Sequence, residues 1–177
     1  FENRLSAADS ACLWFEKAIA GVATLESPRV QGECELLSAE AQLAAAQLSR
    51  SAISYLDAAV SHIDRGLEIG RASGDEMLQT RLDLVRAAIE IERATVSGER
   101  AFIQRADSML VRISQERGPS MSPVVRANIA CAWARVHRHR WDQTGEVAER
   151  DRAVAEVAAA RGADRRVGLG LEAAAVG

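Results

Sequence analysis

Apolar side chains recur every three or four residues along almost the whole chain, which is the spacing of one face of an α-helix. A clear example is the stripe formed by Leu56, Val60, Ile63 and Leu67. Each segment between two turn signals carries a stripe of this kind. The pattern therefore predicts an all-α protein without a β-sheet.

The signals for the start and the end of a helix repeat at a nearly constant spacing. A capping side chain stands before a helical stripe at Ser27-Pro28, Asp75-Glu76 and Ser122-Pro123, which are separated by 48 and then 47 residues. A second set of turn signals, 47 residues apart, consists of Ser51, Gly98 and Gly145. A period of this size indicates a repeated helix pair, in which each pair buries the apolar face of the next.

The period predicts a single helical-repeat domain over residues 1–177, folded as a right-handed α-α superhelix of about three and a half helix pairs. We expect helix pairs at about 27–72, 75–117 and 122–161, an unpaired helix at 6–24 and the incomplete start of a further repeat at 168–177. Because both ends look ready to continue the stacking, we expect the chain to be a segment of a longer array. Leu84 and Leu110 are expected to be core residues.

Composition supports packed helices and limits the partners. Hydrophobic residues make up 48% of the chain but aromatic residues only 4%, and the many small side chains allow helices to approach closely. A net charge of −3 gives no general attraction to nucleic acid or to an anionic membrane. No apolar run approaches the roughly 20 residues that span a bilayer. The three cysteines form no Cys-x-x-Cys pair, so we expect a reduced, cytoplasmic protein.

The stretch from Asn128 to Ala160 resembles tetratricopeptide-type repeats of high-GC bacteria. The resemblance rests on Arg140-Trp141 at the end of a first helix, on the turn Thr144-Gly145-Glu146, and on Asp151-Arg152-Ala153-Val154 in a second helix. The 47-residue period departs from the usual 34 residues of that family. Long-helix variants occur in bacterial signalling regulators and beside caspase-like CHAT peptidase domains. The resemblance implies partner recognition or oligomerisation.

No residues converge on a recognisable catalytic, cofactor or metal site. The basic cluster at 135–140 spreads around the whole helix, which is typical of a solvated helix end. His62 has only Gly66 at the fourth position beyond it, so a second metal ligand is missing there. Cys34 and Cys131 fall on or near apolar tracks and are expected to pack in the core. We therefore predict no catalytic residue, no cofactor and no metal.

These observations favour a non-catalytic scaffold that binds a protein or peptide in a concave groove lined mainly by the first helix of each pair. Further repeats of the same polypeptide, or a second copy of the chain, are alternative partners. The candidate contact residues are Arg81, Arg86, Asn128, Arg135 and His139.

Three other functions remain open on the sequence alone. One is a sensor or assembly segment of a bacterial transcription or signalling regulator. Another is an adaptor region that controls an attached CHAT-type peptidase. The third is a helical-bundle enzyme with a site between helices, which would require a polar pocket with perturbed acids or histidines.

Overall fold

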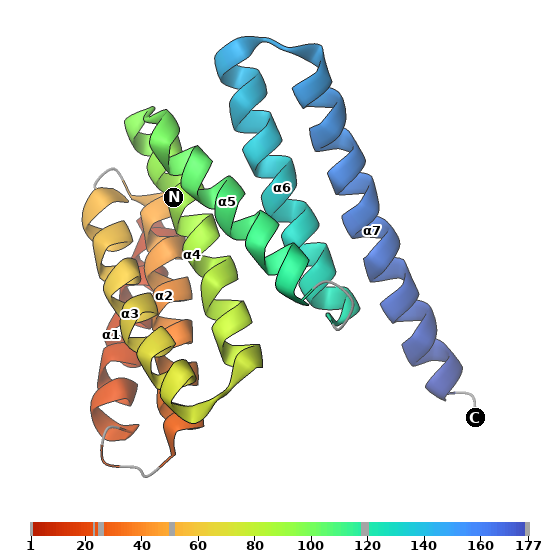
Figure 1. Ribbon diagram of the computed structural model, residues 1–177. Coiled ribbons are helices and arrows are strands. Elements are labelled where there is room, and N and C mark those ends of the chain that lie inside the picture. Colours follow the sequence, from red (N-terminus) through yellow and green to blue (C-terminus); the bar gives the residue numbers. More distant parts are fainter. Residues whose placement is uncertain (1, 23, 25–26, 50–51, 118–120, 176–177) are drawn as a thin grey trace. The chain divides into compact units, whose positions relative to one another are not determined.

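The computed structural model describes the backbone of residues 2–22, 24, 27–49, 52–117 and 121–175, and side chains within these ranges from residue 6 to residue 162, except residue 8. Seven helices and no strand occur in this part of the chain (Figure 1). They are α1 (Glu2–Val22), α2 (Pro28–Leu48), α3 (Ala52–Ser73), α4 (Glu76–Ser97), α5 (Arg100–Arg117), α6 (Pro123–Thr144) and α7 (Val147–Ala175). The predicted all-α class is confirmed.

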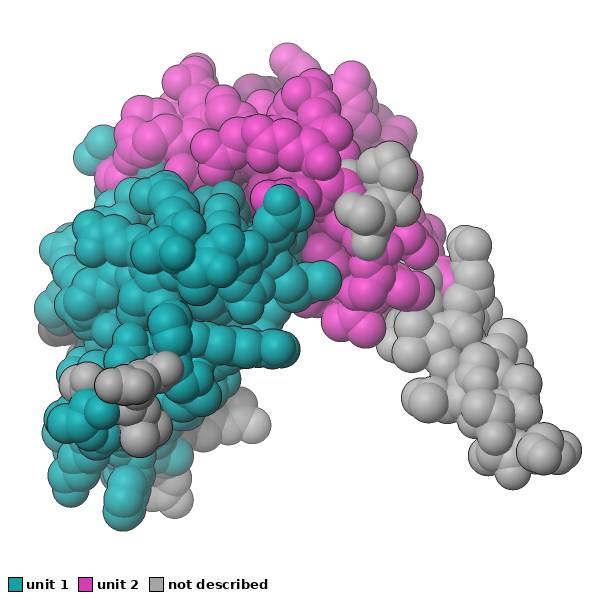
Figure 2. Space-filling view, turned by 60° about the horizontal axis from the view of Figure 1, so that its bottom comes forward, with its two compact units in different colours: residues 1–99 teal, residues 100–177 magenta. Residues whose placement is uncertain are grey.

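The chain divides into two compact units, residues 1–99 and residues 100–177 (Figure 2). The first unit holds α1 to α4, and the second holds α5 to α7. The predicted helix pair at 75–117 is therefore shared between the units, with α4 in one and α5 in the other. That residues 1–177 form one repeat domain stays a prediction.

The predicted helix starts are confirmed. Asp75 accepts a hydrogen bond from the Leu78 N–H at 3.0 Å, and Ser122 accepts one from the Val125 N–H at 3.3 Å. Ser27 has the extended backbone of a cap and is followed by Pro28, although its side chain caps no N–H. Ser51 lies outside the described residues, directly before α3.

The glycines of the periodic turns end helices in the left-handed conformation. Gly98 has a φ of 75° and its N–H donates to the Ala94 carbonyl at 2.8 Å. Gly145 has a φ of 70° and donates in the same way to the Trp141 carbonyl at 2.7 Å. Only glycine adopts this conformation without a steric penalty, so the two turns of the 47-residue period have the same physical cause.

At the C-terminal side the structure differs from the sequence prediction. Helix α7 continues without a break to Ala175, so residues 168–175 extend it instead of starting a further repeat; residues 176 and 177 lie outside the described part. Gly168 and Gly170 each cost a helix only about 1 kcal/mol. Without a proline or a capping residue beside them, these glycines do not end the helix.

The helix predicted at 6–24 corresponds to α1, which packs against α2.

The core of the first unit lies where α2, α3 and α4 meet. Leu36, Leu56, Ile63 and Leu82 are completely buried there, as the sequence stripe of α3 predicted for two of them. In the second unit, α6 packs against α7 and to a smaller extent against α5. Leu110 on α5 is fully buried as predicted, whereas Leu84 on α4 is only half-buried.

Glycines let the helices of the first unit approach closely. A Cβ on Gly32 of α2 would lie 2.3 Å from Leu78 Cδ2 of α4, and a Cβ on Gly66 of α3 would lie 2.8 Å from Leu82 Cδ2. Both leucines are buried, so neither can turn into solvent.

In the described part of the chain, no helix combines the length and apolarity needed to cross a membrane.

We predict that Gly32→Ala lowers the free energy of unfolding by about 1 kcal/mol. The overpacking penalty of about 1–3 kcal/mol exceeds the helix-propensity gain of at most about 1 kcal/mol. Urea unfolding followed by circular dichroism measures the change. Gly21→Ala is the matched control, because nothing lies within 4 Å of its new methyl group. Equal stabilisation by both substitutions would contradict the proposed close packing.

Candidate binding groove between α6 and α7

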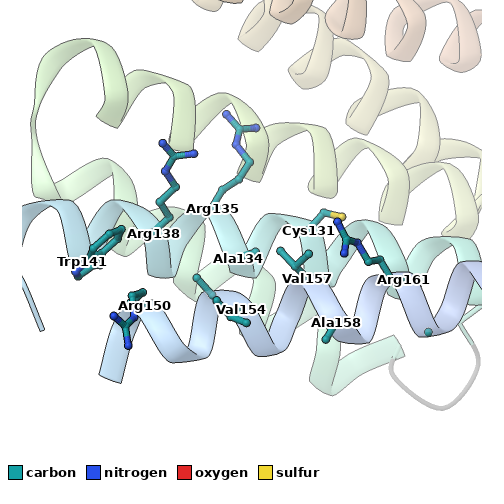
Figure 3. A pocket seen from close by; sticks show the side chains of 12 residues that line it. Cys131, Ala134, Arg135, Arg138, Trp141, Arg150, Val154, Val157, Ala158 and Arg161 are labelled. Atoms are coloured by element: carbon teal, nitrogen blue, oxygen red, sulfur yellow. The ribbon is translucent and has the colours of Figure 1, made fainter. Parts of the chain in front are cut away.

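A cavity of about 760 Å³ runs along α6 and α7 in the second unit (Figure 3). The described residues of its lining come from these two helices, at positions spaced by three or four residues, so each helix presents one face to it. The lining residues are Cys131, Ala134, Arg135, Arg138, Trp141, Arg150, Ala153, Val154, Val157, Ala158, Arg161 and Gly162.

The floor of this groove is apolar and open to solvent. Figure 3 shows Val154 and Val157 between the two helices, and these residues are 65% and 40% exposed. Trp141 on α6 is 37% exposed at one end. The alanines of the lining are too short to fill the space above them. Water therefore covers apolar surface that a partner could bury.

Arginines form the polar part of the lining. Arg135 and Arg138 extend from α6, and Arg150 and Arg161 come from α7 (Figure 3). Among the side chains that the structure describes, no carboxylate belongs to the lining. Arg138 pairs locally with Asp142 at 3.9 Å, and Arg150 pairs with Asp151 at 2.9 Å. Exposed pairs of this kind contribute about 0–1 kcal/mol, so a ligand carboxylate can compete for these guanidinium groups.

A second hollow of about 320 Å³ extends the groove toward the start of α6. It is lined by Pro123, Val124, Ala127, Asn128, Cys131, Ala160 and Arg161. Cys131 and Arg161 line both cavities, so the two hollows are neighbours along the same pair of helices.

The groove contains two of the five residues predicted from the sequence. Arg135 lines the first hollow and Asn128 lines the second. His139 lies one helical turn beyond Arg135 but outside the lining. Its Nε2 is 2.9 Å from Gln143 Nε2, and burial lowers the pKa of its imidazole, against the opposing effect of Asp142.

The other two predicted residues belong to the first unit, where each forms an ion pair. Arg81 Nη1 donates to both carboxylate oxygens of Glu33, at 2.6 and 2.8 Å. Arg86 pairs with Asp64 of α3. These arginines bridge neighbouring helices in the structure.

Sequence reasoning named no residue of α7 as a candidate contact, because it expected the groove to be lined mainly by the first helix of each pair. Arg150, Val154, Val157 and Arg161 follow helical spacing, and this basic and apolar stripe was the available signal.

The expectation that Cys34 and Cys131 are core residues was wrong. Cys34 is only partly buried, and Cys131 is exposed because its side of α6 faces the groove.

A buried polar contact ties α6 to α7. His137 Nδ1 lies 2.7 Å from Glu149 Oε2, and the imidazole stacks on Trp133 with ring centroids 5.7 Å apart. Arg152 Nη1 donates to the other oxygen of Glu149 at 2.7 Å. The hydrogen bond from His137 lowers the pKa of Glu149; burial opposes this shift, and the charges of His137, Arg152 and Arg140 add to it.

A similar buried contact occurs in the first unit. His62 of α3 lies 2.7 Å from Glu35 Oε2 of α2 through Nδ1, and 3.0 Å from Glu16 Oε1 of α1 through Nε2. Arg65 Nε donates to Glu35 Oε1 at 3.0 Å. Burial acts to raise the pKa of Glu35, but the hydrogen bonds from His62 and Arg65 outweigh it and the pKa is lowered.

These histidines hold helices together and do not line either hollow of the groove. Within the described ranges, no three histidine, cysteine or acidic side chains are grouped so that they could hold a metal ion. The arrangement of the groove suits binding through apolar contact and arginine hydrogen bonds.

Comparison of the chain with models of protein families, with curated proteins and with solved structures found no match.

We predict that acid destabilises the second unit partly through Glu149. Its pKa is lower in the folded chain than the ordinary value of 4.5, so the ionised carboxylate stabilises the fold above that pH. This contribution is lost as the pH falls through the lower folded-state value. Glu149→Gln should cost about 1–3 kcal/mol at pH 7 and should flatten the loss of stability below about pH 5.

Urea unfolding at a series of pH values from neutral to acidic measures both effects. The exposed residue Glu146, three positions earlier on the chain, provides the control variant Glu146→Gln. This variant should keep the wild-type pH dependence. Parallel pH profiles for Glu149→Gln and the wild type would contradict the role of the His137–Glu149 contact.

Proposed function

We propose that this chain is a non-catalytic scaffold that binds a protein or peptide in the groove between α6 and α7. The observation that carries the proposal is the groove itself, in which exposed valines and a tryptophan lie between arginines. Burial of Val154 and Val157 by a partner would contribute about 25 cal/mol for each Å² removed from water.

The form of the groove favours a macromolecular partner with an extended contact surface. It is open along two long helices and continues from the first hollow into the second. Interior backbone N–H and C=O groups of a helix are already bonded within it, so recognition must come from side chains. A helix laid into a groove is a recurring mode of recognition that uses such surfaces.

We further propose that the chain belongs to a right-handed α-α superhelix of tetratricopeptide-like repeats. The support comes from the period of the helix starts at Pro28, Glu76 and Pro123 and from the matching turns at Gly98 and Gly145. Within each unit, consecutive helices also pack against each other. Repeats of this kind build extended binding surfaces, which agrees with the proposed scaffold role.

We predict that the chain selects peptides from a phage-displayed random library and that Val154→Gln weakens their binding at least about tenfold. The polar amide would replace exposed apolar contact in the groove, while the stability of an exposed site should change by less than about 0.5 kcal/mol. Fluorescence anisotropy with labelled selected peptides measures the affinity.

Val147→Gln is the matched control. Val147 lies on the same helix and is 56% exposed, but it does not line the groove. It should bind the selected peptides as the wild type does. Failure to select any peptide, or equal affinity of the two valine variants, would overturn the proposed function.

A further inference from the structure

The charge of the groove differs in sign from the charge of the chain. The chain carries a net charge of −3, yet the described residues that line the first hollow include four arginines and no acidic residue. Arg161 also lines the second hollow. A ligand in the groove therefore meets a local concentration of positive charge from both α6 and α7.

Arginine specifies the chemistry of the complementary group. Its planar guanidinium presents donors in a fork that matches a carboxylate, and the contact is charge-assisted. Arg138 is exposed over 77% of its side chain and Arg150 over 51%. Both can turn from their exposed local partners toward a carboxylate of a ligand.

The apolar floor decides which kind of anionic ligand fits. A nucleic acid could bind the arginines but would leave Val154 and Val157 in contact with water. An amphipathic helix satisfies both parts, because its apolar stripe covers the valines while acidic residues beside the stripe reach the arginines. Ala134, Ala153 and Ala158 are small enough to let another helix approach closely.

The dimensions of the lining match a helix of a few turns. The lining residues span 131–141 on α6 and 150–162 on α7, and a rise of 1.5 Å per residue makes these stretches about 15–18 Å long. A peptide helix of about three turns covers that length.

Building on the proposed function, we propose that the groove binds an acidic amphipathic helix, with glutamate or aspartate on both sides of its apolar stripe. The carboxylates would pair with Arg135 and Arg138 at one edge and with Arg150 and Arg161 at the other. The apolar stripe would lie on Val154, Val157 and Trp141.

The test uses a capped helical peptide of about 16 residues, with leucines spaced three or four apart and glutamates beside them. A second peptide carries glutamine in place of each of those glutamates. We expect the full chain to bind the glutamate peptide at least about tenfold more tightly at low salt. The difference in affinity between the two peptides should shrink as the salt concentration rises to about 1 M, because screening then restricts electrostatic interactions to a short range.

Protein variants assign the preference to the groove. The double variant Arg135→Gln/Arg138→Gln should reduce the affinity for the glutamate peptide about tenfold and leave the glutamine peptide nearly unchanged. Arg100→Gln/Arg112→Gln removes the same charge from α5, outside the groove lining, and should preserve the preference. Circular dichroism of each variant verifies that it is folded.

The outcomes separate this inference from the proposed function. Equal binding of both peptides, with both lost on Val154→Gln, would overturn the acidic preference and leave the groove as a peptide site. Binding of neither peptide would overturn the inference, while the library selection would decide the proposed function independently. Tighter binding of a single-stranded DNA oligonucleotide, unaffected by Val154→Gln, would show that the arginines serve a nucleic acid.

Discussion

In a protein built only of helices, interior backbone groups bond within their own helix, so side chains alone hold one helix to the next. In the first unit this constraint is met by close approach. Gly32 and Gly66 make room for Leu78 and Leu82 of α4, and fully buried leucines and isoleucines fill the space between helices. On the face formed by α6 and α7, alanines and the exposed residues Val154 and Val157 leave apolar surface uncovered, and this surface forms the floor of the groove.

Polar contacts supplement apolar packing where helices meet, and they use the same pair of residue types in both units. His62–Glu35 joins α3 to α2, and His137–Glu149 joins α6 to α7. A buried carboxylate is costly unless hydrogen bonds compensate it, and here a histidine and an arginine bond each glutamate. Histidine–carboxylate proximity by itself is therefore weak evidence for catalysis, because these pairs have a sufficient structural explanation.

Local sequence signals predicted the elements well because caps and glycine turns act over a few residues. Asp75, Ser122, Gly98 and Gly145 have the roles that their spacing indicated. The continuation of α7 depends on a small difference in free energy between helix and turn. The partial exposure of Leu84 depends on neighbours that are distant in sequence. The groove was predicted only in part, since Asn128 and Arg135 were named while the contribution of α7 was not. To predict which face of α6 lies opposite which face of α7, the rotation of each helix about its own axis must be known. A stripe of apolar residues alone does not determine that rotation.

The arginine lining also shows why net charge is a poor guide to the chemistry of a local site. Interactions between exposed charges are screened over about 8 Å at physiological salt. Arg138 and Arg150 each keep an exposed acidic partner, Asp142 and Asp151, whereas acidic residues far from the groove lower the net charge without acting on the arginine lining. The overall value of −3 argues against a general affinity for polyanions. It is compatible with recognition of a few carboxylates, because that depends on charges within a screening length and on the apolar surface between them.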